Sequence, residues 1–186
     1  MLYPNKIKKS NHHDIIYSNR GINLENLINE ANEYYLNNDI AVIYKKPTPI
    51  KIGKVDYQKN KVLVKGTLNQ KSTLDYVGLY KGKYLDFDAK STLNKTAFPL
   101  ANVHPHQISH IRKILKHGGI AFLIIEINNN AFILSGEYFI SFIDNNERKS
   151  IPYKDILENG HIINYGYNPV LNYLEVLERI YFKEGV

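Results

Sequence analysis

Cysteine is absent from all 186 positions of the chain. Its absence excludes disulfide bonds and thiolate metal sites, and it fits a cytoplasmic protein. Long apolar runs are missing as well: no stretch is long enough to span a bilayer, and the first residues lack the apolar core of a secretory signal. We therefore expect a cytoplasmic protein that does not enter a membrane.

Glycine-rich phosphate loops, internal repeats and linkers are also missing, so we expect no nucleotide cofactor and no ATP hydrolysis. The chain does contain 44% hydrophobic residues, enough for one folded domain with a real core. Its net charge of +6 favours polyanionic partners such as nucleic acids. Part of that charge reflects a composition rich in Lys, Ile, Asn and Tyr, which suggests an AT-rich genome.

Patterning along the chain predicts an α/β fold around a mixed sheet. Helical spacing of apolar residues predicts one helix from Asn23, a second over residues 105–117 and a last one that Pro169 opens. Strands are expected at residues 40–46, 61–65, 120–125 and 131–135. The first of these is predicted to be buried and the third to be covered on both faces. Residues 1–18 form a predicted flexible basic arm, followed by a single domain over residues 19–186.

The most informative stretch ends in a strictly alternating segment. From residue 85 to residue 90, three apolar side chains alternate with Asp86, Asp88 and Lys90. A period of two residues predicts a half-buried strand with the charged side chains on one face. A solvated acidic face is the ordinary alternative for such a pattern.

A short polar turn precedes this strand. If Lys81 and Gly82 form a two-residue hairpin loop, the register places Asp75 opposite Asp88. The same register places Thr73 opposite Lys90, whereas a three-residue loop with a bulge would shift it by one. Opposed side chains have Cβ atoms about 4.5–5.5 Å apart, so two carboxylates there need positive charge between them. A divalent cation together with Lys90 would supply it.

These residues carry a resemblance to a known family. Asp75, a hairpin and Asp88-Ala89-Lys90 resemble the PD-(D/E)xK nuclease signature, which alone is weakly specific. Longer blocks resemble the RecU family of Holliday junction resolvases from low-GC Gram-positive bacteria. The blocks are residues 18–21, 40–49, 72–76, 80–84, 86–90, 94–96, 98–100 and 106–107. In this order they are strongly specific, and they cover nearly the whole chain.

The resemblance implies a fold and an activity. The fold would be restriction-endonuclease-like, a mixed central β-sheet flanked by helices, with a basic β-stalk projecting at about residues 47–70. The activity would be symmetric nicking of four-way DNA junctions by a homodimer, in homologous recombination and DNA repair, with a link to the strand-exchange recombinase. A family aromatic near Leu68 is missing here, which puts a wedge role of the stalk in doubt.

The resemblance, with the chemistry of hard oxygen ligands, also assigns the site. Asp75 and Asp88 would hold Mg²⁺, with the Ala89 carbonyl as a further ligand, and Mn²⁺ is expected to substitute. Lys90 would orient the attacking water or stabilise the pentavalent phosphate. Thr73 and Gln107 would be outer ligands, acting directly or through water. The family more often has Glu at position 88, so the shorter Asp moves the expected metal position slightly.

Other residues are assigned with ordinary alternatives beside them. DNA-phosphate contacts are predicted for Arg20, Lys51, Lys54, Lys61, Lys65 and Lys95; the alternative is a set of solvated surface charges. In this superfamily a glutamate of the first helix often lies near the metal, which makes Glu25 or Glu30 a candidate. Asp86 is left open as a ligand, a supporting partner or a solvated carboxylate. His106 and His110 have the spacing of a zinc pair, but no third ligand accompanies them.

Two rival functions remain at this stage. The first is a related nuclease of the same core that acts on linear duplex DNA. The second is a non-catalytic module that binds junctions or the recombinase. An intact set of Asp75, Asp88 and Lys90 argues against the second, because a protein that has lost catalysis commonly loses at least one such residue.

Overall fold

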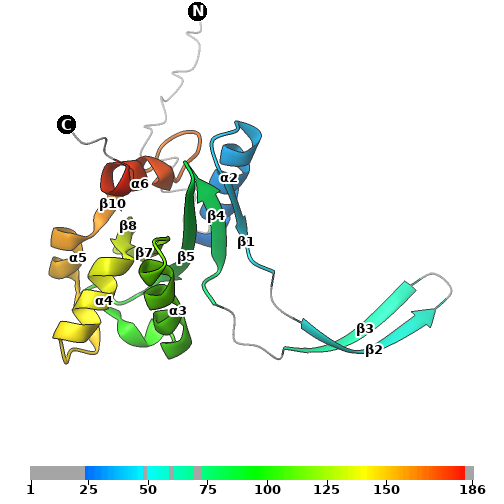
Figure 1. The fold of residues 1–186 in the computed structure, drawn as a ribbon. Helices are drawn as coiled ribbons and strands as arrows, with labels where there is room; N and C mark the ends of the chain where they lie inside the picture. The colour runs from blue at the N-terminus through cyan, green and yellow to red at the C-terminus, as the bar shows by residue number, and fades with distance from the viewer. Residues whose placement is uncertain (1–23, 48–49, 59–60, 69–72, 183–186) are drawn as a thin grey trace, which may run out of the picture.

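The computed structural model describes residues 24–47, 50–58, 61–68 and 73–182. A six-stranded sheet forms its centre, with the order β1-β4-β5-β7-β8-β10 (Figure 1). The strands are β1 (Val42–Lys45), β4 (Tyr76–Tyr80), β5 (Lys83–Ser91), β7 (Ile120–Ile127), β8 (Asn130–Ser135) and β10 (His161–Ile163). Only the β5–β7 pair is parallel, so the sheet is mixed, as predicted.

Helices cover both faces of this sheet. The helices α2 (Leu24–Asn37) and α6 (Tyr173–Tyr181) pack on one face, where Phe87 stacks between Tyr76 and Phe122 with ring centroids 4.9 and 4.5 Å apart. The helices α3 (Pro105–Lys116), α4 (Gly136–Asn145) and α5 (Tyr153–Asn159) pack on the other. These layers confirm the predicted α/β class. Within the described ranges, no helix has both the length and the apolar character to cross a membrane.

A separate hairpin leaves this body. Its strands β2 (Ile50–Gln58) and β3 (Lys61–Leu68) pair antiparallel, with one register shift between Ile52 and Lys54. Figure 1 shows this hairpin projecting away from the central sheet, as expected of the stalk. In the register, Lys54 is the cross-strand partner of Lys65.

Two strands differ from their predicted burial. β1 lies at the edge of the sheet. Only Ile43 is buried, because it faces the core under α2, while the opposite face of β1 is exposed. β5 lies inside the sheet and is buried on both faces, including the fully buried Asp86 and Asp88. The predicted half-buried strand, and its alternative of a solvated acidic face, are both wrong since α3 covers the carboxylates.

Other elements shift or appear only in the structure. α6 begins at Tyr173 rather than at Pro169, because Leu171 first pairs with Tyr165 in an isolated β-bridge. The apolar segment at residues 139–143 is part of α4, which Ser135 caps by accepting a hydrogen bond from the Tyr138 N–H. Residues 91–102, which follow the charged strand, contain β6 (Ala97–Pro99), which pairs with β9 (Ser150–Pro152), and the 3-10 helix η1 (Leu100–Asn102). The predicted arm of residues 1–18 lies outside the described residues.

Candidate active site

The β4–β5 hairpin sets the geometry of the site. Lys81 and Gly82 have φ angles of 45° and 73°, the left-handed conformation that a tight two-residue turn requires. Tyr80 therefore pairs with Lys83, and the ladder continues to Tyr76 opposite Phe87. One further step along the same register would place Asp75 opposite Asp88. The predicted hairpin register is thus confirmed from Tyr80 to Tyr76, and the pairing of Asp75 with Asp88 stays a prediction.

Asp88 is a buried acid of the site with a raised pKa. One carboxylate oxygen, Oδ2, accepts hydrogen bonds from Lys90 Nζ at 3.0 Å and from Gln107 Nε2 at 2.5 Å. The other oxygen, Oδ1, is buried and has no hydrogen-bond partner among the described residues. Burial raises the pKa of Asp88 to about 7; Lys90 opposes the shift and the neighbouring Asp75 adds to it.

Asp75 lies near enough to Asp88 for its charge to add to the raised pKa of Asp88. Two carboxyl groups in contact are stable only with a proton or a cation between them. Among the described residues no three His, Cys, Asp or Glu side chains cluster as a metal cage. Mg²⁺ fits this donor set nonetheless, since it is commonly bound by one or two carboxylates with water and substrate phosphate completing the shell. Asp88 Oδ1, which has no partner in the described part of the chain, is the atom to which such a cation would bind.

Gln107 joins α3 to the site. Its side-chain oxygen accepts the His104 N–H at 3.0 Å, forming the capping box that starts the helix. Its Nε2 then points at Asp88 and also donates to the Thr73 carbonyl oxygen at 3.3 Å. Gln107 thus holds Asp88 directly; its role as an outer metal ligand stays a prediction.

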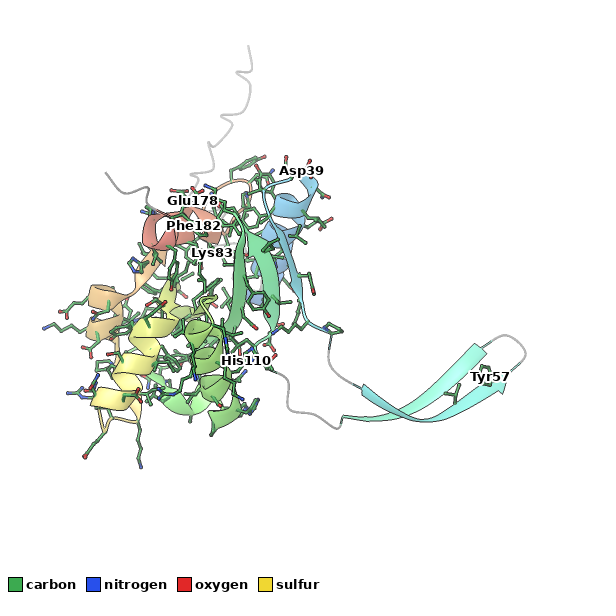
Figure 2. The ribbon with its side chains drawn as sticks, viewed as in Figure 1. Asp39, Tyr57, Lys83, His110, Glu178 and Phe182 are labelled. Carbon is green, nitrogen blue, oxygen red and sulfur yellow. The ribbon has the colours of Figure 1, made fainter. Side chains whose placement is uncertain are left out.

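Asp86 lies next to the site in a network that the sequence did not reveal. Both of its oxygens accept from Lys46 Nζ, at 2.8 and 2.9 Å, and Oδ2 also contacts His110 Nε2 at 2.8 Å and the Tyr84 hydroxyl at 3.1 Å. Figure 2 shows His110 on α3, near the end of the sheet from which the stalk departs. Asp86 is therefore not solvated, which removes one of the three roles that the sequence left open.

The histidines of α3 occupy different environments. The His106 ring stacks on His104 with centroids 5.5 Å apart, whereas His110 contacts Asp86. They do not converge as a zinc pair would. His110 follows Gln107 by three positions on one helix face, and this spacing is the signal that could have placed it at the site. Lys46 offered no such local signal.

Of the two candidate glutamates, Glu25 lies nearer the site. It forms an ion pair with Lys45, and its backbone oxygen accepts from the Tyr76 hydroxyl. The pKa of Tyr76 is raised by burial first and then by the charges of Glu25, Asp75 and Asp88. Glu30 is exposed on α2. Help from Glu25 at the metal stays a prediction.

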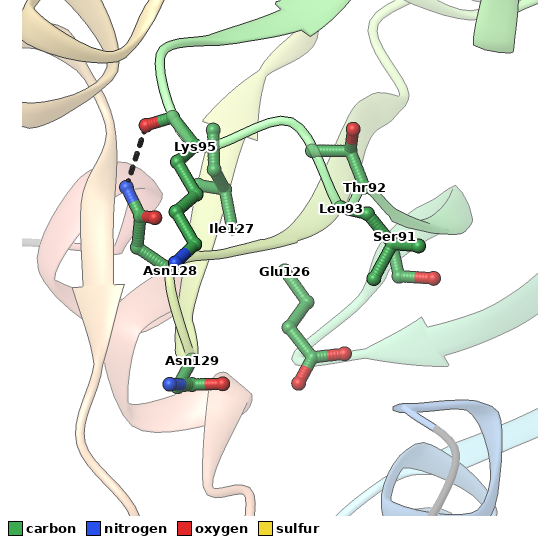
Figure 3. Close-up of a pocket in the computed structure, with 8 residues that line it drawn as sticks. All are labelled: Ser91, Thr92, Leu93, Lys95, Glu126, Ile127, Asn128 and Asn129. Atoms are coloured by element: carbon green, nitrogen blue, oxygen red, sulfur yellow. Dashed lines mark hydrogen bonds between the residues drawn. The ribbon is translucent and has the colours of Figure 1, made fainter.

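The predicted DNA contacts are spread over the molecule. Lys95 lines a polar hollow of about 410 Å³ with Ser91, which follows Lys90, and with Glu126 (Figure 3). Its carbonyl oxygen accepts from Asn128 Nδ2 at 2.8 Å, which fixes the loop. Burial raises the pKa of Glu126 in this hollow.

The other predicted DNA contacts lie elsewhere. The stalk strands β2 and β3 carry Lys51, Lys54, Lys61 and Lys65. Arg20 lies outside the described residues.

Comparison with known proteins identifies the family. The sequence-family model of RecU, "Recombination protein U", matches residues 19–179. The Holliday junction resolvase RecU of Bacillus cytotoxicus is 45% identical over 188 residues, covering 97% of this chain and 92% of the relative. The one from Geobacillus sp. (strain WCH70) is 47% identical over 173 residues, covering 89% and 86%. The solved structure of the Holliday junction resolvase Hjc from Archaeoglobus fulgidus matches with a TM-score of 0.38 and 9% identity, covering 69% of this chain and 87% of Hjc. The matches to the RecU model and to its curated relatives extend along most of the sequence, and this chain belongs to the RecU family.

Proposed function

We propose that this protein is a structure-specific endonuclease that resolves four-way DNA junctions by Mg²⁺-dependent nicking in homologous recombination and repair. The curated relatives, at 45% and 47% identity, are named Holliday junction resolvases. The observation that carries the proposal in this chain is the buried Asp88, whose Oδ2 pairs with Lys90 while its Oδ1 has no hydrogen-bond partner among the described residues.

Each residue then has a chemical task. Asp75 and Asp88 would hold Mg²⁺, which would supply an activated water and positive charge for the scissile phosphate. The Ala89 carbonyl is a further candidate ligand. Lys90, whose side chain is only 19% exposed, keeps a cation beside Asp88 Oδ2 and faces the charge that develops on the phosphate. Gln107 fixes the Asp88 carboxylate from the helix side.

The function is tested by cleavage of a mobile four-way junction beside a linear duplex, each with Mg²⁺ or with EDTA. Paired Mg²⁺-dependent nicks on opposing strands of the junction, without cutting of the duplex, are expected. Equal cleavage of the duplex would show a general nuclease of the same core. Tight junction binding without nicks would show a binding module and place the shorter Asp88 side chain in question.

A homodimer is part of the proposal because two symmetric nicks require two sites. The described part of the chain leaves an apolar patch on β1 and β4, made of Val42, Tyr44 and Leu79, each more than half exposed. Val42 and Leu79 are register partners, and the patch lies on the sheet face that carries Asp75. We expect Val42→Glu with Leu79→Glu to shift the protein toward monomer by light scattering, because charges there oppose burial in an interface. An unchanged dimer would remove this patch from the interface, and Leu157→Glu, on exposed α5, is the control.

Protonation of Asp88 is expected to make metal binding depend on pH. Its pKa of about 7 lies above the ordinary value of 3.8, so folding favours the protonated acid. In metal-free protein this contribution to stability is fully present below pH 4 and is lost as the pH rises through 7. Mg²⁺ needs the ionised carboxylate, so the Mg²⁺-induced rise in Tm should be small at pH 6 and larger at pH 8. Thermal melts measure both trends, and Asp88→Asn should remove them. Equal Mg²⁺ effects at the two pH values would contradict the assignment.

A further inference from the structure

Lys46 lies where the stalk leaves the body. It follows β1 and precedes Pro47, while the chain returns from the stalk at Thr73 and Asp75. The Lys46 N–H donates to the Asp75 carbonyl oxygen at 2.7 Å, and Lys46 Nζ donates to Thr73 Oγ1 at 3.0 Å. One residue of the outgoing chain thus contacts the returning chain twice, at two residues assigned to the metal site.

The same amine is anchored from a second side. Lys46 Nζ lies 2.8 and 2.9 Å from the two oxygens of Asp86, whose side chain is fully buried, and the Lys46 side chain itself is only 20% exposed. His110 and Tyr84 hold Asp86 in turn. A buried ion pair with additional hydrogen bonds has a defined geometry, and loss of one partner leaves an uncompensated charge. The Lys46 amine is therefore fixed relative to β5 and α3.

Asp75 depends on this anchor because it lies one residue before β4 begins. Its backbone is tied to β1 by the Lys46 N–H, and Thr73 beyond it is tied by the Lys46 amine. Asp88, by contrast, lies within β5 and is held by Lys90 and Gln107. Lys46 thus supports the Asp75 half of the metal site, while Gln107 holds Asp88 and also reaches the Thr73 carbonyl oxygen.

We propose that Lys46 is a positioning residue that holds Asp75 and Thr73 at the metal site and ties the base of the stalk to β5. It acts through Thr73 and the Asp75 backbone. The proposal rests on the function proposed above, since it assumes that Asp75 binds the catalytic metal.

The test separates positioning from simple neutralisation of Asp86. Lys46→Met alone leaves the buried Asp86 carboxylate without its cationic partner. The decisive variant is therefore Lys46→Met/Asp86→Asn, which also removes the negative charge of Asp86. If Lys46 served only folding, this variant would recover Tm, metal affinity and cleavage together. We expect it to recover Tm but to bind Ca²⁺ about 10–100-fold more weakly by calorimetry, the usual scale for lost support of a metal ligand. The Mg²⁺ concentration for half-maximal junction cleavage should rise in parallel.

Controls keep the outcome decisive. His110→Asn removes a different Asp86 partner without touching Thr73 or Asp75, and it should keep Ca²⁺ affinity within about threefold, a small change beside that expected for lost ligand support. Lys46→Arg preserves charge and donors and should retain most of the affinity. Should the double variant fail to fold, loss of Ca²⁺ affinity in His110→Asn equal to that in Lys46→Met would overturn the proposal. Ca²⁺ affinity of wild-type strength in the folded double variant would overturn it directly.

The two proposals fail in different ways. A wild-type protein that binds Ca²⁺ at this site but cuts no junction would end the proposed function, and the Ca²⁺ comparison would still decide the role of Lys46. A wild-type protein that cuts junctions, together with a double variant of unchanged metal affinity, would end only the inference about Lys46.

Discussion

Asp75→Asn is expected to abolish Mg²⁺-dependent junction cleavage while leaving junction affinity nearly unchanged. The substitution keeps the size of the side chain but removes the charge that, with Asp88, would hold the cation. We expect cleavage to fall by on the order of a thousandfold, the scale seen when one group that stabilises transition-state charge is removed. Binding should persist because the predicted DNA contacts lie on other residues. Gel-shift titration in Ca²⁺ and single-turnover cleavage in Mg²⁺ measure the two quantities.

A matched control and a clear contrary outcome accompany this prediction. Asp144 is exposed and pairs with Arg112, with Arg112 Nη1 2.8 Å from Asp144 Oδ2. An exposed pair of this kind contributes little to stability, so Asp144→Asn should cleave as the wild type does. Strong cleavage by Asp75→Asn would remove Asp75 from the metal site. Loss of junction binding by that variant would instead assign Asp75 to recognition or folding.

Replacing Lys51, Lys54, Lys61 and Lys65 together with Gln should weaken junction binding and flatten its salt dependence. All four lie on the stalk hairpin, and the register makes Lys54 and Lys65 direct cross-strand partners. Each lysine that contacts a phosphate adds about 0.9 to the slope of log affinity against log salt. Loss of four such contacts would therefore reduce the magnitude of the slope by roughly 3–4 units. Fluorescence anisotropy with a four-way junction from low to moderate salt gives this slope directly.

The comparison needs lysines of the body as a reference. Lys83, at the start of β5, and Lys154, on α5, are both exposed. Their replacement with Gln lowers the net charge at positions away from the stalk, so the slope should change little. An unchanged slope in the stalk variant would exclude the stalk from the DNA surface. An equal fall per charge in both variants would indicate general electrostatic attraction instead of a stalk contact.

Local patterns in the sequence were sufficient for the hairpin that brings the acids together. The alternation of residues 85–90 and the turn at Lys81 and Gly82 depend only on neighbours along the chain, so the register from Tyr80 to Tyr76 followed from counting. The helix of residues 105–116 and the central strand from Ile120 were predictable for the same reason, since apolar periodicity is a local property.

Only the tertiary structure decided which charged groups are buried and what holds them. Lys46 and Asp86 are 40 positions apart, and Gln107 and Asp88 are 19 apart, so neither contact follows from spacing. Burial of Asp86 and Asp88 required α3 to cover the β5 face, while β1 stayed partly open because it is the edge strand. The sequence by itself determined the register of the β4–β5 hairpin, and the family resemblance added the basic stalk. The partnerless oxygen of Asp88, its raised pKa and the Lys46 anchor arise from packing between distant segments, because burial and charge pairing depend on the whole fold.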